Sequence, residues 1–204
     1  MRKLLLCGLA LSSLTTVAQA AGPAAAGGPP PSFGGNAVFC QGRYALCIKA
    51  YCPTPKGLPA PGQKIDCECN IVDGWSMGPD SCEDRAKNLV STYSNLYNAK
   101  DKTLFCESES TIWAWCYGAP CTVDPKDPKK ARCSCPVEQS AAKTLGGRCQ
   151  PSACSKVWSA ATPAADAFAN DYFFTVGKEK GYSPNPPAVA CSNAIAKPGG
   201  GSDR

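Results

Sequence analysis

The chain has 204 residues with 15 Cys, 19 Pro and 19 Gly, no His, and a formal net charge of +5. The absence of His excludes Ser-His-Asp and Cys-His nucleophilic sites, His general bases and every metal site that needs a His ligand. An odd number of cysteines cannot all pair with one another, so the 15 Cys need an explanation before any function is considered.

Residues 1–20 have the pattern of a secretory signal peptide. A basic pair at positions 2 and 3 precedes a short apolar run, and an A-x-A cleavage site ends at Ala20. The run is too short to span a bilayer, and Cys7 lies inside it rather than at its end, so we expect neither a membrane anchor nor lipidation. The pattern predicts an exported protein, periplasmic or extracellular, with no transmembrane segment in the mature chain.

Removal of the signal peptide leaves 14 Cys, an even number, in an oxidising compartment. This favours up to seven disulfides. The net charge falls to +3, because 19 basic and 16 acidic residues remain, and we expect no nucleic-acid partner. Residues 21–35 are almost entirely Ala, Gly and Pro and are typical of a flexible leader.

Twelve of the mature cysteines form two sets of six with matching spacing. Corresponding members lie 66, 69, 69, 66, 66 and 67 residues apart, and flanking residues match as well: Phe39 corresponds to Phe105, and Val90 to Val157. The pattern predicts two tandem homologous units, residues 36–105 and 106–175. The cysteines assigned to structural disulfides in the two sets are Cys40, Cys47, Cys52, Cys67, Cys69 and Cys82, then Cys106, Cys116, Cys121, Cys133, Cys135 and Cys149.

Two further cysteines, Cys154 and Cys191, lie outside these sets. Lys87 stands in the first unit where Cys154 stands in the second. The simplest pairing joins Cys154 to Cys191 and fixes the C-terminal extension, residues 176–204, although spacing alone does not determine connectivity. We expect the end of this extension to be disordered.

The predicted secondary structure consists of short strands and one or two helices. Residues 65–72 alternate as a half-buried strand does, which puts Cys67 and Cys69 on one face and Glu68 on the other, and residues 131–137 repeat the pattern. Neither unit has enough apolar residues for a large core, so cross-links should supply much of the stability. The expected fold class is a small disulfide-rich α+β protein.

The sixth Cys of each unit is followed by a segment with helical features. Ser81 can cap a first helix, in which Ala86, Leu89, Val90, Tyr93, Leu96 and Tyr97 would share one face. Thr162-Pro163 is a cap followed by Pro at the first helical position. A second helix should run from there to about Phe174, with Phe168, Tyr172 and Phe173 near one face.

Thiolate metal binding is the main alternative to structural disulfides. Two C-x-C pairs and two C-x4-C pairs offer soft ligands for zinc or copper. Export favours disulfides, so we expect no metal site and no cofactor. The chain has no C-x-x-C, which argues against a redox enzyme.

Catalysis by carboxylates needs no His and has to be considered separately. The acidic side chains that cluster in the sequence are Asp66, Glu68, Asp73 and Asp80 in the first unit and Glu107 and Glu109 in the second. Glu68 corresponds to Ser134 in the repeat, so we interpret these residues as surface charge. We interpret no motif in the chain as supporting a Ser-Lys dyad, and we expect no catalytic residue and therefore a non-enzymatic protein.

Aromatic, basic and loop residues offer further binding hypotheses. Trp113 and Trp115 share one strand face, and their counterparts Tyr44 and Leu46 favour packing over ligand contact. The basic run Lys126, Lys129, Lys130 and Arg132 is interleaved with Asp124 and Asp127 and is typical of a solvated turn. The loops 53–64 and 122–130, each between cysteines, suggest a secreted inhibitor or toxin-like effector as an alternative function.

The six-cysteine spacing resembles that of epidermal-growth-factor-like modules, and Val72-Asp73-Gly74-Trp75 is similar to the Gly-aromatic element of their last loop. This resemblance implies pairing of the first Cys with the third, the second with the fourth and the fifth with the sixth.

The chain also resembles a family of small exported cysteine-rich bacterial proteins of unknown function. The residues that carry this likeness are 121–125, 130–135, 144–149 and 157–162. The resemblance implies an exported, disulfide-linked protein and brings no activity, ligand or site with it. We therefore expect a binding or cell-envelope role, with another envelope or extracellular protein as the partner class to consider. Thiolate metal binding and the inhibitor remain the alternatives.

Overall fold

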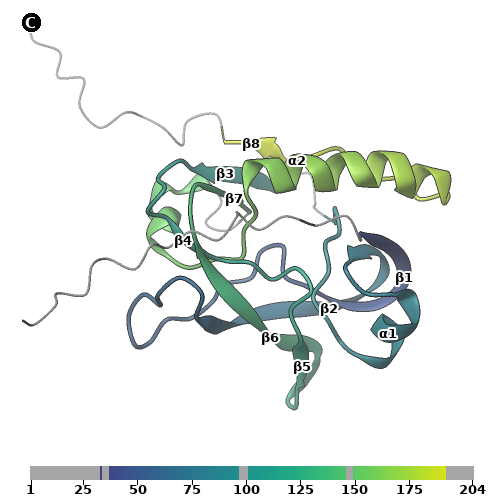
Figure 1. The fold of residues 1–204 in the computed structure, drawn as a ribbon, viewed down its shortest axis with the longest axis horizontal. Coiled ribbons are helices and arrows are strands. Elements are labelled where there is room, and N and C mark those ends of the chain that lie inside the picture. The colour runs from purple at the N-terminus through teal and green to yellow at the C-terminus, as the bar shows by residue number, and fades with distance from the viewer. Residues whose placement is uncertain (1–32, 34–36, 97–100, 146–148, 192–204) are drawn as a thin grey trace, which may run out of the picture.

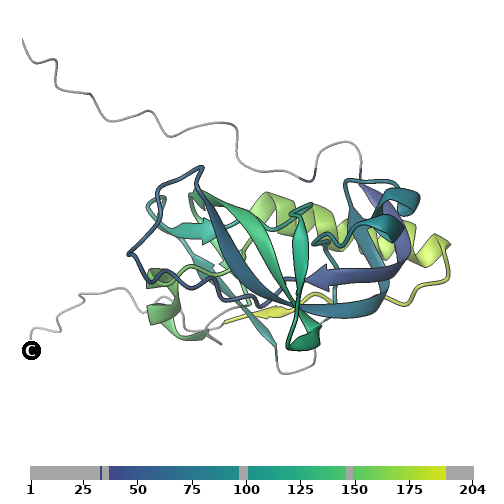
Figure 2. The ribbon, with the colours of Figure 1, turned by 90° about the horizontal axis from the view of Figure 1, so that it is seen from below.

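The computed structural model describes Phe33 and residues 37–96, 101–145 and 149–191. The expected signal peptide, nearly all of the expected leader and the residues after Cys191 lie outside this described part. Helix α2 (Pro163–Tyr172) lies along one side of a twisted sheet (Figure 1). The view from below shows the strands in front and α2 behind them (Figure 2). The predicted small disulfide-rich fold, with sheets and one main helix, is confirmed.

The main sheet has five antiparallel strands in the order β1-β2-β6-β4, with β5 also beside β6. The strands are β1 (Val38–Leu46), β2 (Lys64–Gly78), β4 (Ile112–Ala114), β5 (Cys121–Asp124) and β6 (Asp127–Gln139). Strand β2 belongs to the first half of the chain, before residue 106, and β6 to the second half. The two halves therefore share one sheet, in which Cys67 lies opposite Cys133.

A smaller sheet joins the C-terminal segment to the second half. Its central strand β3 (Lys102–Cys106) pairs antiparallel with β7 (Ala142–Thr144) and parallel with β8 (Val189–Ala190). The main-chain N–H of Cys191 donates to the carbonyl of Thr103 at 2.9 Å. Residues 187–191 are thereby fixed alongside β3.

The alternation predicted around the C-x-C pairs is confirmed. In β2, Cys67 and Cys69 are buried while Glu68 is exposed, and residues 131–137 lie within β6. The strand β2 is 15 residues long, so it extends well beyond the short segment expected from the sequence. Its alternating pattern holds because the face that carries the cysteines packs against the core.

The first predicted helix begins where expected and ends early. Helix α1 spans Cys82–Lys87, and the Ser81 hydroxyl oxygen accepts from the main-chain N–H of Asp84 at 3.1 Å. The expected continuation along an apolar face is wrong, because residues 89–93 are extended and bond to strands on both sides. Leu96 is 39% exposed, and Tyr97 lies outside the described residues.

The second predicted helix is confirmed as α2, with Thr162 as its cap and Pro163 as its first residue. A π-helical turn, Phe173–Gly177, continues it. Phe173 is fully buried and Tyr172 half-buried; Phe168 is 45% exposed, but its ring centroid lies 5.9 Å from those of Tyr172 and Phe33, so it borders the same aromatic cluster. A short 3-10 helix, Pro151–Ser155, precedes α2.

Seven disulfides join the fourteen cysteines of the described chain. The pairs are Cys40–Cys82, Cys47–Cys69, Cys52–Cys67, Cys106–Cys154, Cys116–Cys135, Cys121–Cys133 and Cys149–Cys191. In the first half these links are nested, first to sixth, second to fifth and third to fourth. The second half repeats the two inner links and replaces the outer one.

Two expected pairings are wrong. Cys154 bonds to Cys106 rather than to Cys191, because the 3-10 helix packs on β3, and Cys191 bonds to Cys149. The pairing implied by the epidermal-growth-factor-like spacing is also absent. The register of β1 and β2 places Leu46 opposite Asn70, and this brings the next residues, Cys47 and Cys69, together.

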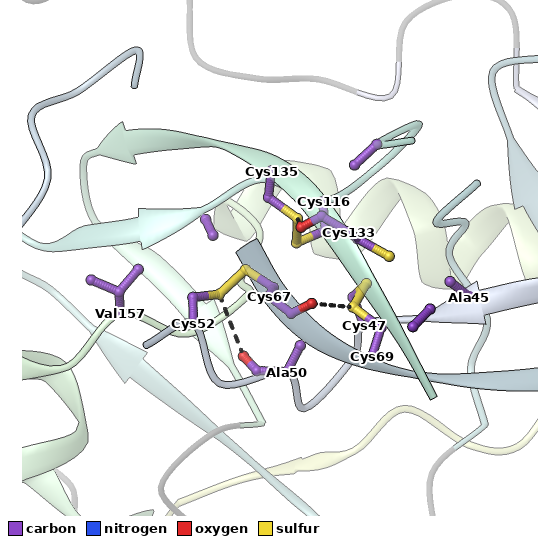
Figure 3. Close-up of a cluster of buried hydrophobic side chains, with 13 residues drawn as sticks. Ala45, Cys47, Ala50, Cys52, Cys67, Cys69, Cys116, Cys133, Cys135 and Val157 are labelled. Carbon is purple, nitrogen blue, oxygen red and sulfur yellow. Dashed lines mark hydrogen bonds between the residues drawn. A yellow bond between two sulfur atoms is a disulfide. The ribbon is translucent and has the colours of Figure 1, made fainter. Parts of the chain in front are cut away.

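Sulfur atoms fill much of the core between the halves (Figure 3). Two of the four inner disulfides are attached to β2 and two to the neighbouring strand β6. Their buried members include Cys52, Cys67, Cys133 and Cys135, which are fully buried. A second cluster is aromatic and joins the π-helical turn after α2 to β1 through Phe39 and Phe173, whose ring centroids are 5.0 Å apart. The helix is thus held against the sheet by aromatic packing.

Residues 89–93 in the first half and residues 157–161 in the second half make equivalent main-chain hydrogen bonds. Ala45 donates to Val90 and Ala114 to Trp158, at 3.0 and 2.9 Å. Each segment also bonds to the opposite half, since Cys121 donates to Leu89 and Cys52 to Val157. Leu89 therefore occupies the position equivalent to Val157, and the sequence match of Val90 with Val157 is wrong by one residue.

Candidate ligand-binding cavity

A cavity of about 320 Å³ lies between the cysteine-rich core and helix α2. Four short segments form its floor. Residues 46–48 begin with the last residue of β1, and residues 115–117 directly follow β4. The other two segments are residues 91–93 and 159–161. Phe33, the first turns of α2 and the C-terminal segment at Pro187 and Ala188 border the cavity on its other sides. A pocket of this volume is at the lower end of the range for small-molecule sites, about 300–1,000 Å³.

The floor of the cavity combines equivalent segments from both halves. The carbonyl of Ala45 accepts a hydrogen bond from Thr92, and that of Ala114 accepts one from Ala160. Met77 exchanges two main-chain hydrogen bonds with Tyr93, and Lys143 exchanges two with Ala161. The two halves therefore form the same main-chain hydrogen bonds around the cavity floor, whereas their side chains at equivalent positions differ.

The open space lies where the second half has smaller or polar residues. Tyr93 packs its ring against Phe33 and Phe173, with ring centroids 5.6 Å apart in both cases. The equivalent position in the second half is Ala161, whose methyl group leaves most of that volume empty. Met77 is fully buried, whereas its equivalent Lys143 lines the cavity.

Aromatic rings form one wall of the cavity. The Phe33 ring centroid lies 4.6 Å from that of Tyr117, 5.1 Å from that of Trp115 and 5.6 Å from that of Tyr93. Burial raises the pKa of Tyr117 well above its usual value, so its hydroxyl stays uncharged at neutral pH. This wall offers ring faces and edges to a bound molecule without any net charge.

An ion pair forms the charged part of the lining. Lys143 Nζ lies 2.9 Å from Asp166 Oδ2, and the two side chains are 31% and 22% exposed. Partial exposure places the pair at the solvent-facing edge of the cavity. Among the described lining residues these are the two that carry charge, and they neutralise each other.

Three polar side chains near the floor are engaged in structural bonds, whereas the hydroxyls of Thr92, Ser94 and Tyr117, which also line the cavity, have no hydrogen-bond partner within the described residues. The Ser159 hydroxyl donates to the carbonyl of Cys47, and the Ser91 hydroxyl donates to Cys47 Sγ at 3.0 Å. The Thr144 hydroxyl donates to the carbonyl of Ser159 at 2.9 Å. These bonds fix the floor and hold its shape before any ligand enters.

The two tryptophans singled out from the sequence have different environments. Trp113 is 2% exposed, and its indole N–H donates to the Ser140 hydroxyl at 3.1 Å, so it is a packing residue as expected. Trp115 is half-buried and lines the cavity. Their ring centroids are 6.0 Å apart, so Trp113 supports the ring that faces the cavity.

The acidic residues considered for catalysis do not gather at one site. Asp66, Glu68 and Asp73 are exposed on β2, and Glu107 and Glu109 are exposed after β3. Asp80 is half-buried just before α1. None of these six side chains lines the cavity.

The predicted solvated turn joins β5 to β6. The carboxylates of Asp124 and Asp127 accept from the main-chain N–H groups of Lys126 and Lys129 at 2.8 and 2.9 Å, which is how such side chains stabilise turns. The four basic side chains of this run are exposed. We interpret them as the solvated face of a hairpin.

Two groups of cysteine sulfurs lie close enough together to hold a metal ion if they were thiolates. The groups are Cys47, Cys69 and Cys133, and Cys67, Cys116 and Cys135. All six are disulfide-bonded, and a metal ligand must be a thiolate. Metal binding at these positions would therefore require reduction of the buried core.

Ser140 and Lys143 have the spacing of an S-x-x-K motif, so the expectation that nothing in the chain supports a Ser-Lys dyad overlooked a match. The structure separates their roles. Ser140 accepts from Trp113 and donates to the carbonyl of Ala141, while Lys143 pairs with Asp166.

Comparison with protein-family models, with curated proteins and with solved structures finds no match for this chain. Within the described residues, no helix combines the length and the apolar character needed to cross a membrane.

Proposed function

We propose that this protein is an exported, disulfide-stabilised, non-enzymatic protein with a binding or cell-envelope role, and that it binds a small molecule in the cavity under α2. The observation that carries the proposal is a preformed space of about 320 Å³ with an aromatic wall and a floor fixed by hydrogen bonds. Concave, mostly apolar sites with few polar groups are where proteins bind small ligands.

Export is supported by the signal-peptide pattern of residues 1–20 and by the seven disulfides, which form and persist in oxidising compartments. A duplicated unit is supported by the cysteine spacing and by the equivalent hydrogen bonds of residues 89–93 and 157–161. In this proposal the two units are not independent domains. Each sends its last extended segment across the other, and the cavity forms at their junction.

A binding role is favoured over catalysis by the state of the lining groups. Lys143 and Asp166 neutralise each other, and the hydroxyls of Ser91, Ser159 and Thr144 are engaged with the backbone or with a disulfide sulfur. A nucleophile or general base needs a free lone pair directed at a substrate. The hydroxyls of Thr92, Ser94 and Tyr117 also line the cavity and have no hydrogen-bond partner within the described residues, but the carboxylate of the lining, Asp166, is paired with Lys143 and is not free to activate them. The geometry supports holding a molecule rather than transforming it.

The experiment is a titration with 2-naphthol, a neutral two-ring probe, followed by quenching of tryptophan fluorescence. The substitution A161Y places at the cavity the residue that fills the equivalent position of the first half, so we expect it to weaken binding at least about tenfold. A164Y is the matched control, because Ala164 is exposed on α2 and does not line the cavity. Equal binding by the wild type and A161Y would contradict the proposal.

A secreted inhibitor is the second candidate function, and one observation favours it. Cys52–Cys67 and Cys121–Cys133 directly cross-link the ends of the two loops 53–64 and 122–130, and Leu58 in the first loop is 63% exposed. A braced loop with an exposed apolar side chain can enter a protease cleft at little entropic cost. Incubation with a panel of proteases tests it: inhibition that L58A abolishes would support this function, and no inhibition would exclude it.

A further inference from the structure

We infer that the ligand of the cavity is an uncharged, ring-bearing small molecule; this inference rests on the proposed function. The charges of the cavity lining favour an uncharged ligand. The charged side chains among the described lining residues, Lys143 and Asp166, are 2.9 Å apart and already compensate each other. An ionic ligand would lose its hydration on entry and find no unpaired opposite charge, and burial of an uncompensated charge is costly.

The second step is shape. The rings of Phe33, Trp115 and Tyr117 lie at one side of the cavity with centroid separations between 4.6 and 5.8 Å. Flat ring systems gain from such surroundings, because aromatic pairs prefer edge-to-face or offset contacts at these distances. A cavity of about 320 Å³ is roughly twice the ~150 Å³ that an engineered apolar cavity needs to hold benzene, so two fused rings fit its size.

The third step concerns the edge of the site. The Lys143–Asp166 pair is partly exposed, and Asn170 lies one helical turn beyond Asp166 on the same side of α2. The Asn170 side chain already donates to the carbonyl of Asp166 and accepts from the Tyr93 hydroxyl, so the ion pair is what this edge offers to a ligand, and it donates and accepts hydrogen bonds without adding net charge. A ligand with a hydroxyl or carbonyl group on its ring can therefore place that group at the edge and its apolar part against the rings.

The experiment compares three probes that share one ring system and differ in charge: 2-naphthol, 2-naphthoate and (2-naphthyl)methylammonium. Each is titrated into the full oxidised protein at pH 7 by calorimetry. We expect 2-naphthol to bind at least about tenfold more tightly than either ion. Two variants test the cause: D166N leaves the Lys143 charge unpaired and should improve 2-naphthoate binding severalfold, and K143M should do the same for the ammonium probe.

The outcomes separate this inference from the proposed function. If either ion binds the wild type as tightly as 2-naphthol, or if D166N does not improve binding of 2-naphthoate and K143M does not improve binding of the ammonium probe, the inference is wrong and the binding cavity stands. If none of the three probes binds the wild type, the proposed function itself is wrong.

Discussion

The two halves of the molecule share a backbone pattern and fill it differently. In the first half, Met77 and Tyr93 exchange main-chain hydrogen bonds, and their side chains pack into the aromatic cluster beneath α2. In the second half, Lys143 and Ala161 make the same hydrogen bonds, and a cavity lies beside them. The cavity therefore lies where a few smaller or polar side chains stand on main-chain hydrogen bonds that both halves share.

The outer disulfides provide the second difference. The first half closes on itself through Cys40–Cys82, with Cys82 at the start of α1. In the second half Cys106 takes the added Cys154, which leaves Cys149 to bond with Cys191. The C-terminal segment is thereby fixed beside β3, where Pro187 and Ala188 close the cavity.

The largest expected effect comes from exchanging the residues at the matched positions 77 and 143. M77K introduces an ammonium group at a fully buried position among aromatic rings, and we expect a loss of at least about 4 kcal/mol in the free energy of unfolding. K143M removes a half-exposed ion pair and should cost less than about 1 kcal/mol. Urea denaturation under non-reducing conditions measures the free energy of unfolding of both variants. Similar losses for M77K and K143M would contradict the contrast between a filled position 77 and an open position 143.

A smaller effect is expected from the two outer disulfides. Cys40–Cys82 and Cys149–Cys191 both join residues 42 apart in sequence, and removal of either, as C40S/C82S or C149S/C191S, should cost about 2–4 kcal/mol. The nested Cys47–Cys69 link already shortens the first loop by about half. We therefore expect C149S/C191S to lose about 0.6 kcal/mol more, in proportion to the logarithm of loop length.

Urea denaturation of C40S/C82S and C149S/C191S also tests the expected order of their stability losses. If C40S/C82S loses clearly more stability than C149S/C191S, the loop-length argument fails and native contacts of the first half dominate. The comparison of the two double variants, rather than either loss alone, is the informative quantity.

Local features of the fold could be predicted from the sequence. Ser81 and Thr162-Pro163 mark helix starts because caps act on neighbouring main-chain groups, and the C-x-C alternation gave the buried face of β2 because side chains alternate along any strand. The extended segment after Asn88 could not be predicted. Its apolar spacing suits a helix, and it is extended because strands from both halves supply hydrogen-bond partners.

The disulfide pairing and the position of the cavity depend on contacts between residues far apart in the sequence, and local sequence patterns do not predict such contacts. Cys106 finds Cys154 because the 3-10 helix packs on β3, and spacing alone left several pairings open. Lys143 and Asp166 meet because α2 crosses β7, and neither residue stands out in the sequence. The aromatic Trp115 was found by its strand pattern, whereas its cavity-facing position follows from the placement of Phe33 and α2.

The central claim, that the second half opens a ligand site where the first half is filled, is tested most directly by an NMR titration of the isotope-labelled oxidised protein with 2-naphthol. The account predicts amide and indole shift changes concentrated at Trp115, residues 159–161 and the first turns of α2, with little change at Met77 or in loop 53–64. Saturable binding with shifts confined to loop 53–64, or no binding at all, would contradict it.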